Sequence, residues 1–258
     1  MANTALITGA SSGIGAEFAR YHARKGGDMI ITARREEALN DLKAEIEAEH
    51  GVKVHVVALD LGAPDGAKQL FDKVEAAGLE VDILINNAGF GGQGAHADRA
   101  LDDEMAMIDL NVRSLVALTH MVVQGMVARG KGKILHVGST AGFMPGPNQA
   151  VYFATKAFVK SFSEALDQEL RHKGVTSTVL APGYVETEFA KTANLEGTKL
   201  IQGGGKSAKS VAKHGYDAMR RGELVTVNEG MLGFMVNWII PLLPRRMVLR
   251  MMQGMQAK

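Results

Sequence analysis

The sequence contains no cysteine among its 258 residues. This absence excludes disulfide bonds, thiol nucleophiles and cysteine-ligated metals, and it is compatible with a reducing cytoplasm. A large excess of charge of one sign is also lacking: the net charge of +1 gives no broad positive field for nucleic acid. The eight histidines show no spacing typical of metal ligands, so we expect no metal site.

Long hydrophobic segments are scarce. The start, MANTALITGA, lacks the basic and apolar regions of a signal peptide, and we expect a cytoplasmic protein. The most apolar run, MLGFMVNWIIPLLP at 231–244, is too short to span a bilayer and contains Asn237 and two prolines. The hydrophobic fraction of 46% and the charged fraction of 22% are ordinary for a globular protein.

The chain alternates short β-branched runs with longer helical patterns. Alternation of this kind predicts the α/β class, with one doubly wound parallel sheet of about seven strands and helices on both faces. We expect strands at 5–9, 28–33, 52–60, 81–89, 132–139, 175–183 and 223–227. We expect helices at about 13–25, 36–50, 64–77, 101–129, 151–173 and 207–222. No repeat or linker divides the chain, so residues 1–258 are predicted to form a single domain.

Two segments depart from this rhythm. Residues 184–210 have no clean periodicity and contain three consecutive glycines, which predicts a mobile substrate lid with one or two short helices. Residues 231–258 form a hydrophobic and basic C-terminal tail. An interface between subunits or a cover over the pocket is the favoured interpretation of this tail; contact with a membrane surface through a basic amphipathic helix is less favoured.

A glycine-rich turn, TGASSGIG at 8–15, follows the first predicted strand directly. Its spacing differs from the G-x-G-x-x-G fingerprint, but its physical role can be the same. Glycines allow the backbone to approach a pyrophosphate, and the N–H groups of the next helix point at that charge. A plain strand-to-helix turn is the alternative; the position after the first strand of a doubly wound sheet favours a nucleotide site.

The second predicted strand ends in Ala33 and is followed by Arg34 and Arg35. An NAD site usually has at this position an acid that binds the ribose hydroxyls. Two guanidinium groups instead match a 2′-phosphate, which favours NADP(H) as the cofactor. The alternative is a solvated helix start in which these arginines pair with the following glutamates, Glu36 and Glu37.

The stretch VYFATKAF at 151–158 places Tyr152 and Lys156 four residues apart. On a helix these side chains share a face. One interpretation is a helix that buries its apolar residues and exposes the lysine. The other is an acid–base pair, because a fixed cation lowers a tyrosine pKa from its usual value of about 10.

Taken in order, these motifs resemble the short-chain dehydrogenase/reductase family over nearly all of the chain up to about residue 190. The motifs are TGASSGIG, NNAG at 86–89, PGYVET at 182–187, and a tetrad of Asn111, Ser139, Tyr152 and Lys156. The resemblance implies a Rossmann-type fold and NADP(H)-dependent hydride transfer between the nicotinamide and a carbonyl or secondary alcohol. It also implies these cofactor contacts: Gly9, Ser11, Ser12, Gly13, Ile14, Gly15, Arg34, Arg35, Asp60, Leu61, Asn87, Ala88, Gly89, Tyr152, Lys156, Pro182, Gly183, Val185 and Thr187.

The family pattern assigns a role to each tetrad residue. Tyr152 is the implied general acid or base, Lys156 holds the phenolate and the ribose, and Ser139 donates to the substrate oxygen. Asn111 is implied to kink its helix and hold a water that relays protons through Lys156. Considered alone, Asn111 could instead be a helix cap and Ser139 an ordinary strand end.

A softer similarity, carried by NNAGFGGQGA, MRRGE and LLPRR, points to the NADP-linked subgroup related to ketoacyl and hydroxysteroid reductases. Apolar residues near the predicted pocket suggest a hydrophobic small-molecule substrate. The family implies a homodimer or homotetramer. The alternative function is a non-catalytic NADP(H)-binding redox sensor that acts through a partner; a Rossmann-type isomerase or dehydratase using the same tyrosine is a weaker third reading.

Overall fold

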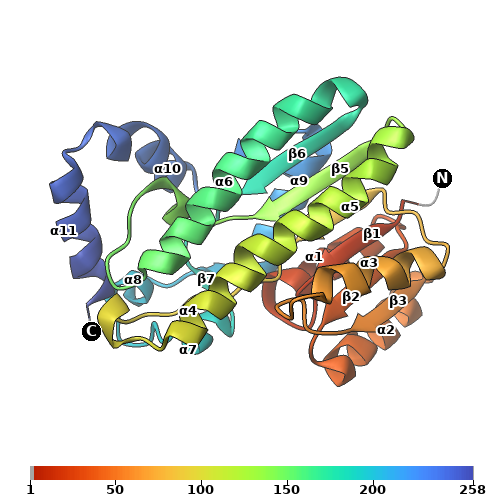
Figure 1. Cartoon of the computed structure of the whole chain (residues 1–258), viewed down its shortest axis with the longest axis horizontal. Helices are drawn as coiled ribbons and strands as arrows, with labels where there is room; N and C mark the ends of the chain where they lie inside the picture. Colours follow the sequence, from red (N-terminus) through yellow and green to blue (C-terminus); the bar gives the residue numbers. More distant parts are fainter. Residues whose placement is uncertain (1–2, 258) are drawn as a thin grey trace.

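The computed structural model describes residues 3–257 and contains one central parallel sheet (Figure 1). Its order is β3-β2-β1-β4-β5-β6-β9, and every neighbouring pair is parallel. The strands are β1 (Ala5–Thr8), β2 (Met29–Ala33), β3 (Val54–Ala58), β4 (Ile83–Asn86), β5 (Gly132–Val137), β6 (Val175–Leu180) and β9 (Val225–Thr226). The predicted α/β class and the single sheet of seven strands are confirmed.

Helices cover both faces of this sheet. One face carries α1 (Gly13–Ala23), α2 (Glu36–His50) and α9 (Ala208–Arg221). The other face carries α3 (Gly66–Ala76), α5 (Leu115–Ala128) and α6 (Ala150–Leu170), which lie in front of the sheet in Figure 1. The strands are apolar on both sides because both sides are covered.

Side chains of opposite orientation on each strand enter opposite halves of the core. On β1, Ile7 packs with the α1 and α2 side, whereas Leu6 packs with α3 and α5. The same alternation separates Ile31 from Ile30 on β2. This period of two fixes the register of each strand, because a slip by one residue would exchange the two faces.

The strand order reverses between β1 and β4, which lie side by side at the centre of the sheet. In a doubly wound sheet, ligands bind beyond the carboxyl ends of the strands at this point. The loops that follow β1, β2, β4, β5 and β6 contain the glycine turn, the two arginines, NNAG, Ser139 and PGYVET, whereas Tyr152 and Lys156 lie on α6. The topology therefore gathers them at one edge.

The predicted long helix is present but not uniformly α-helical. It runs through α4 (Leu101–Ile108), a π-helical segment (Asp109–Ser114) and α5, with Asn111 inside the π segment. By length and apolar composition alone, Leu101–Ala128 could cross a membrane. Four of its polar side chains, Glu104, Asn111, Ser114 and Thr119, are buried in the protein, and Thr119 accepts a hydrogen bond from Asn86 of β4. We therefore describe it as a core helix.

The two irregular segments are ordered by short elements. Residues 184–210 contain β7 (Val185–Glu186), α7 (Phe189–Thr192), α8 (Lys199–Gln202) and β8 (Lys206–Ser207), and β7 pairs with β8. The two short helices match the expectation; the strand pair was not expected. The tail consists of α10 (Gly230–Phe234), a π turn (Met235–Ile239), a 3₁₀ turn (Ile240–Leu242) and α11 (Arg245–Gln256).

Candidate active site

The glycine turn after β1 bends sharply toward the cavity. Gly9 has φ +68° and Gly13 has φ +55°, a conformation that side chains with a Cβ rarely adopt. A Cβ at Gly9 would lie 2.8 Å from Nδ2 of Asn87 and 2.9 Å from the Ala88 Cα. The turn leads into α1, whose N-cap Ser12 makes no capping hydrogen bond through its side chain, so the first N–H groups of α1 remain available to an anion.

A cavity of about 720 Å³ lies along the carboxyl edge of the sheet. It is lined by nearly all the residues predicted to bind cofactor: Gly9, Ser11, Ser12, Gly13, Ile14, Arg34, Arg35, Asp60, Leu61, Asn87, Ala88, Gly89, Tyr152, Lys156, Pro182, Gly183, Val185 and Thr187. The donors and glycines of this lining fit a dinucleotide. Gly15 is outside the lining, because it packs against the turn: a Cβ there would lie 2.2 Å from the Gly9 carbonyl oxygen.

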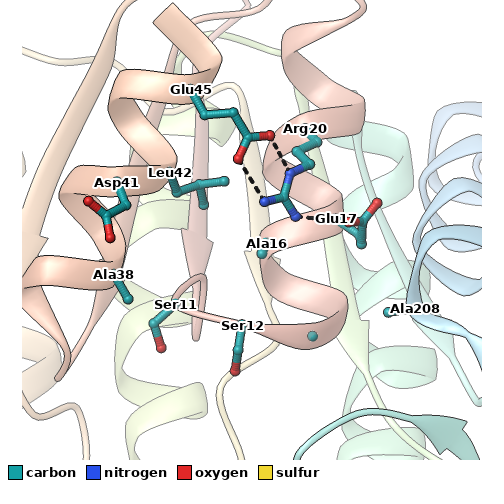
Figure 2. Close-up of a pocket in the computed structure, with 11 residues that line it drawn as sticks. Ser11, Ser12, Ala16, Glu17, Arg20, Ala38, Asp41, Leu42, Glu45 and Ala208 are labelled. Atoms are coloured by element: carbon teal, nitrogen blue, oxygen red, sulfur yellow. Dashed lines mark hydrogen bonds and ion pairs between the residues drawn. The ribbon is translucent and has the colours of Figure 1, made fainter.

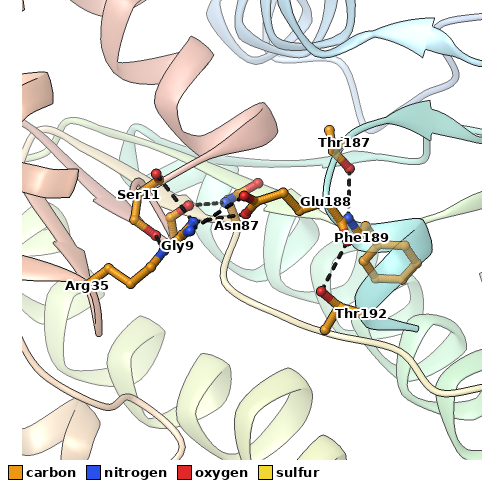
Figure 3. Close-up of polar contacts among 8 residues, drawn as sticks. All are labelled: Gly9, Ser11, Arg35, Asn87, Thr187, Glu188, Phe189 and Thr192. Atoms are coloured by element: carbon orange, nitrogen blue, oxygen red, sulfur yellow. Dashed lines mark hydrogen bonds and ion pairs between the residues drawn. The ribbon is translucent and has the colours of Figure 1, made fainter. Parts of the chain in front are cut away.

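The two predicted arginines stand at one end of this cavity, and one of them is already paired. Nη2 of Arg35 lies 3.0 Å from Oε2 of Glu188, and its Nε donates to Oγ of Ser11 at 3.4 Å. Figure 3 shows Arg35 and Glu188 meeting beside the glycine turn. The expected alternative, pairing of Arg35 with the following glutamates, is not found among the ion pairs of residues 3–257. Arg34 lines the cavity with its side chain exposed.

Glu188 is the residue of this site that sequence reasoning missed. It stands directly after Thr187 of the PGYVET motif, and an acid at this position carries no signal by itself. The Arg35 guanidinium lowers the pKa of Glu188, so the carboxylate is charged at neutral pH. Glu188 is therefore the anionic partner of Arg35 in this structure.

A smaller cavity of about 420 Å³ lies between α1 and α2, beside Ser11 and Ser12 (Figure 2). Arg20 points toward it, but its guanidinium donates to both carboxylate oxygens of Glu45, at 2.7 and 2.8 Å, and to Glu17. These carboxylates raise the Arg20 pKa and satisfy its donors. Arg20 is thus held by two carboxylates, whereas Arg35 is held by one and Arg34 lines the larger cavity.

Tyr152 lies near the start of α6, with its ring 9% exposed. Burial raises the pKa of Tyr152 to about 12, and a hydrogen bond with Ser139 acts in the opposite direction. The expected lowering by Lys156 is therefore not observed; burial disfavours the phenolate more strongly. At neutral pH Tyr152 carries its proton, as a general acid must.

Lys156 is one helical turn after Tyr152 and is also buried. Its Nζ donates to the Val137 carbonyl at 2.9 Å and lies 5.8 Å from the Tyr152 ring centroid. Burial lowers the pKa of Lys156 to about 8. The predicted adjacency of the two side chains is confirmed, whereas the ammonium is held by a main-chain carbonyl of β5.

Ser139 follows β5 and caps the next turn, since its Oγ accepts from the Ala141 N–H at 3.1 Å. Its side chain also acts to lower the Tyr152 pKa and lines the same cavity, so Ser139 lies beside Tyr152 rather than at an ordinary strand end. Asn111 is not a helix cap. Its Oδ1 accepts from the Phe90 N–H at 3.1 Å and its Nδ2 donates to the Phe90 carbonyl at 2.9 Å. Asn111 therefore fixes the loop after β4 from behind the cavity.

Three further predicted residues have partners that explain their positions. Asn87 donates from Nδ2 to the carbonyl oxygens of Thr8 and Gly9, which ties β4 to the glycine turn. Oδ1 of Asp60 accepts from the Gly62 N–H at 2.8 Å and holds the turn after β3. Oγ1 of Thr187 accepts from the Phe189 N–H at the start of α7.

The substrate side of the cavity is apolar. Phe90 and Phe189 line it, and the Phe189 ring lies 5.5 Å from the Tyr152 ring. Phe90 and Phe189 pack against a cluster that contains Tyr152, Phe153 and, from the tail, Ile240, Val248 and Met252. The tail thus covers the substrate side, as one of its two favoured interpretations proposed. Over residues 3–257 no group of His, Asp and Glu is arranged to hold a metal ion.

Comparison with known proteins gives one family. Residues 3–197 match the model of the short chain dehydrogenase family. Sulfoacetaldehyde reductase 2 of Chromohalobacter salexigens is 39% identical over 214 residues, covering 82% of this chain and 81% of that protein. The very-long-chain 3-oxoacyl-CoA reductase of Homo sapiens is 35% identical over 195 residues, covering 72% of this chain and 61% of that protein.

Solved structures extend the likeness to the whole fold. A short-chain dehydrogenase from Sphingobium yanoikuyae in complex with NADPH has a TM-score of 0.85 at 30% identity, covering 93% of this chain and 92% of that one. A 7beta-hydroxysteroid dehydrogenase has a TM-score of 0.87 at 26% identity, covering 97% of this chain and 96% of that one.

Proposed function

The chain belongs to the short-chain dehydrogenase/reductase family, and from that premise we propose that it is an NADP(H)-dependent oxidoreductase acting on a carbonyl or secondary alcohol. One observation carries the proposal. Tyr152, Ser139 and Lys156 line the same cavity as the glycine turn and the two arginines, and the Lys156 Nζ lies 5.8 Å from the Tyr152 ring centroid. The NADPH-bound relative supports the choice of cofactor.

Each residue has a task in this proposal. Bound NADPH supplies the hydride, and the protein supplies position and proton. Tyr152 gives its proton to the carbonyl oxygen, and Ser139 donates a hydrogen bond to that oxygen as negative charge develops. The Lys156 ammonium stabilises the phenolate that Tyr152 becomes. In the reverse direction the phenolate takes the proton from the alcohol.

The substrate is proposed to be hydrophobic near its carbonyl. Phe90 and Phe189 form apolar walls beside Tyr152, and the tail closes the cluster behind them. The names of the relatives span small and large carbonyl compounds, from sulfoacetaldehyde to very-long-chain 3-oxoacyl-CoA. The shared chemistry is reduction of a carbonyl, and the apolar walls favour the larger, less polar end of this range.

The test is NADPH oxidation by the purified protein across carbonyl compounds graded in size, from short alkyl ketones to aryl ketones, ketoacyl thioesters and steroids. The variant Tyr152→Phe is measured in parallel, because it keeps the ring and removes the proton donor. We expect turnover in one size class and its loss, by roughly 100-fold or more, in the variant. Unchanged turnover in Tyr152→Phe would refute the acid.

The alternative of a non-catalytic redox sensor uses the same cavity. A sensor needs the cofactor cradle but has no use for Ser139, Tyr152 and Lys156 together. NADPH titration by fluorescence separates the two proposals. A sensor would bind NADPH, turn over none of the panel and lose nothing on Tyr152→Phe, whereas an enzyme keeps binding in that variant and loses turnover.

The remaining parts of the proposal concern the lid, the assembly and the location. We propose that residues 184–210 close over the cofactor. Trypsin should therefore cut more slowly at the exposed Lys191 and Lys199 when NADPH is bound. We also propose a homo-oligomer in the cytoplasm, which sedimentation and cell fractionation test.

A further inference from the structure

The C-terminal tail has an inner side that its packing explains. Val236, Ile240, Val248 and Met252 are each at most 6% exposed, and the last three belong to the cluster around Tyr152. At the end of α11, the fully buried Gln256 accepts a hydrogen bond from Gln149 at 2.7 Å. These contacts fix the orientation of the tail on the domain.

The opposite side of the tail carries large apolar side chains in solvent. We call Met231, Phe234, Met235, Trp238, Ile239 and Leu242 the apolar outer face. Trp238 is 66% exposed, Met231 76% and Leu242 84%. The members are spaced by three or four residues along Gly230–Leu242, so they form one stripe on a helical segment. An exposed stripe of this kind marks an interaction surface.

Positive charge adjoins this face and negative charge is missing from it. Arg245, Arg246 and Arg250 are exposed on the following helix, α11, together with Met247 and Met251. The sequence from 230 to 258 contains no aspartate or glutamate. Within residues 3–257, none of these three arginines forms an ion pair. The arginines thus lack the anionic partners that this chain gives to Arg20, Arg99 and Arg171.

We propose that the apolar outer face and these arginines bind the surface of an anionic membrane. A bilayer interface offers hydrocarbon to Trp238 and Leu242 and lipid phosphate to the arginines. A second copy of the chain fits less well: a twofold contact of tail with tail would bring arginines together without any carboxylate. The apolar helix Gly230–Leu242 is too short to span, so the contact is peripheral.

This contact would place the substrate side of the cavity near the lipid, because the same tail packs on the cluster around Tyr152. Apolar carbonyl substrates dissolved in the bilayer would then have a short path to the site. Only this consequence depends on the proposed function. The membrane contact itself is measured without turnover, so the failure of one does not imply the failure of the other.

The experiment is flotation of the full chain, with NADPH bound, on vesicles of phosphatidylcholine with and without about 30 mol % phosphatidylglycerol. Trp238 is the only tryptophan in the chain, so its emission reports the outer face directly. We expect the protein to float with the anionic vesicles, its emission to shift to the blue, and salt at about 0.5 M to reverse the binding.

Two pairs of variants separate the contributions of charge and apolar surface. Arg245→Gln with Arg246→Gln should weaken binding roughly 25-fold, about fivefold for each arginine. Its control, Arg24→Gln with Arg113→Gln, makes the same charge change elsewhere and should bind as the wild type does. Leu242→Ser should weaken binding, whereas Leu101→Ser, at a residue that is 69% exposed on α4, should not. Each variant is first checked for wild-type NADPH binding and melting temperature.

Three results would overturn the proposal. The protein could stay in the soluble fraction with anionic vesicles. The tail variants could float as well as their controls do. Or the emission of Trp238 could shift with protein concentration in the absence of vesicles, and Leu242→Ser could change the sedimentation without affecting flotation. The last result would assign the outer face to a second copy of the chain.

Discussion

Arg35 is held in the structure by a carboxylate of the chain itself. Its ion pair with Glu188 joins the turn after β2 to the segment that precedes α7, across one end of the cavity. If NADP(H) binds there, its 2′-phosphate must share or replace Glu188. The two residues therefore have opposite expected effects on cofactor affinity.

Removal of the arginines tests phosphate recognition. Arg34→Ala with Arg35→Ala should weaken NADPH binding by roughly 150-fold or more, because two charged hydrogen bonds of about 1.5–3 kcal/mol each are lost, while NADH binding changes little. Fluorescence titration with both cofactors measures the ratio. Equal losses for NADPH and NADH would contradict recognition of the phosphate by these residues.

Removal of the carboxylate should have the opposite sign. In the wild type, Arg35 must give up its ion pair with Glu188 when NADPH binds, and Glu188→Gln removes this cost. Exposed ion pairs of this kind contribute about 0.2–1 kcal/mol. We expect NADPH to bind about two- to fivefold more tightly and NADH to be unaffected. Glu196→Gln, an exposed residue of the same segment, makes the same charge change and serves as the control. Tightening in both variants would indicate a general effect of charge.

Burial of the Lys156 ammonium, which the proposed chemistry requires, should lower the stability of the fold. Its pKa is lowered from 10.5 to about 8 because the ammonium is buried, so folding disfavours the charged form. Above the folded-state pKa the native protein loses this proton while the unfolded chain keeps it, and stability rises with pH. The free-energy penalty for burying Lys156 is therefore largest below its folded-state pKa of about 8. It decreases as the pH rises toward the unfolded-state pKa of 10.5.

Lys156→Met removes this penalty together with the function. At pH 7 we expect the variant to unfold with a free energy higher by about 1–2 kcal/mol, after loss of the hydrogen bond to Val137. Relative to this variant, the wild type should regain about 2 kcal/mol between pH 7 and 9.5. Urea unfolding across that range measures both. A constant difference in stability between the wild type and Lys156→Met across that range would contradict the burial argument.

At the scale of elements, periodicity predicted every strand of the main sheet and the helices that cover its two faces, but α11 was not among the predicted helices. The errors at element ends were small: β3 is Val54–Ala58 rather than 52–60, and β4 is Ile83–Asn86 rather than 81–89. Local pattern could not predict the π segment at Asn111, which depends on hydrogen bonds to Phe90 from a distant loop. The pairing of β7 with β8 was also missed, because a strand of two residues is too short to show an alternating pattern.

The end of α11 gives a prediction about a buried amide pair. Gln149 and Gln256 share one hydrogen bond, and each has a second buried side-chain atom without a partner among the described residues. Gln256→Leu alone should lower the unfolding free energy by about 1–3 kcal/mol, because it leaves the Gln149 amide unsatisfied. The double change, Gln149→Leu with Gln256→Leu, should recover most of this loss.

A thermodynamic cycle by urea unfolding measures the coupling between the two positions. Gln253→Leu, exposed on the same helix, is the control for helix propensity and should change stability little. If the double variant loses the sum of the single losses, the two amides are not coupled. In that case the anchor of α11 is apolar packing by Val248 and Met252 alone.

At the scale of the whole molecule, the predicted site residues come together because the parallel strands all end at the same edge of the sheet. The loops after β1, β2, β4, β5 and β6 needed no contact information beyond this topology. Glu188 on Arg35 and the tail behind Tyr152 are different: they join segments more than 85 residues apart through side chains whose positions only the folded chain defines. The predicted direction of the Tyr152 pKa shift was wrong for the same reason: the shift is caused by burial, which depends on the whole fold.

The proposed homo-oligomer requires an apolar surface distinct from the tail. Helices α5 and α6 pack on the same face of the sheet, and α6 turns Phe158 outward, 41% exposed and stacked on Phe162 at 5.9 Å. Its neighbours Ala154 and Ala157 are exposed and small, so another helix could approach closely. This surface is the best candidate for contact between subunits.

Phe158→Glu places a charge at the centre of that surface. If two copies meet there, burial of the two carboxylates against each other should dissociate the assembly by at least tenfold in its dissociation constant. Sedimentation velocity at several protein concentrations measures this change, and NADPH binding by the dissociated chain shows that the fold survives. Leu101→Glu, more exposed but on α4, should leave the mass unchanged. If Phe158→Glu also keeps the wild-type mass, the subunits meet elsewhere, and the exposed tail becomes the surface to test next.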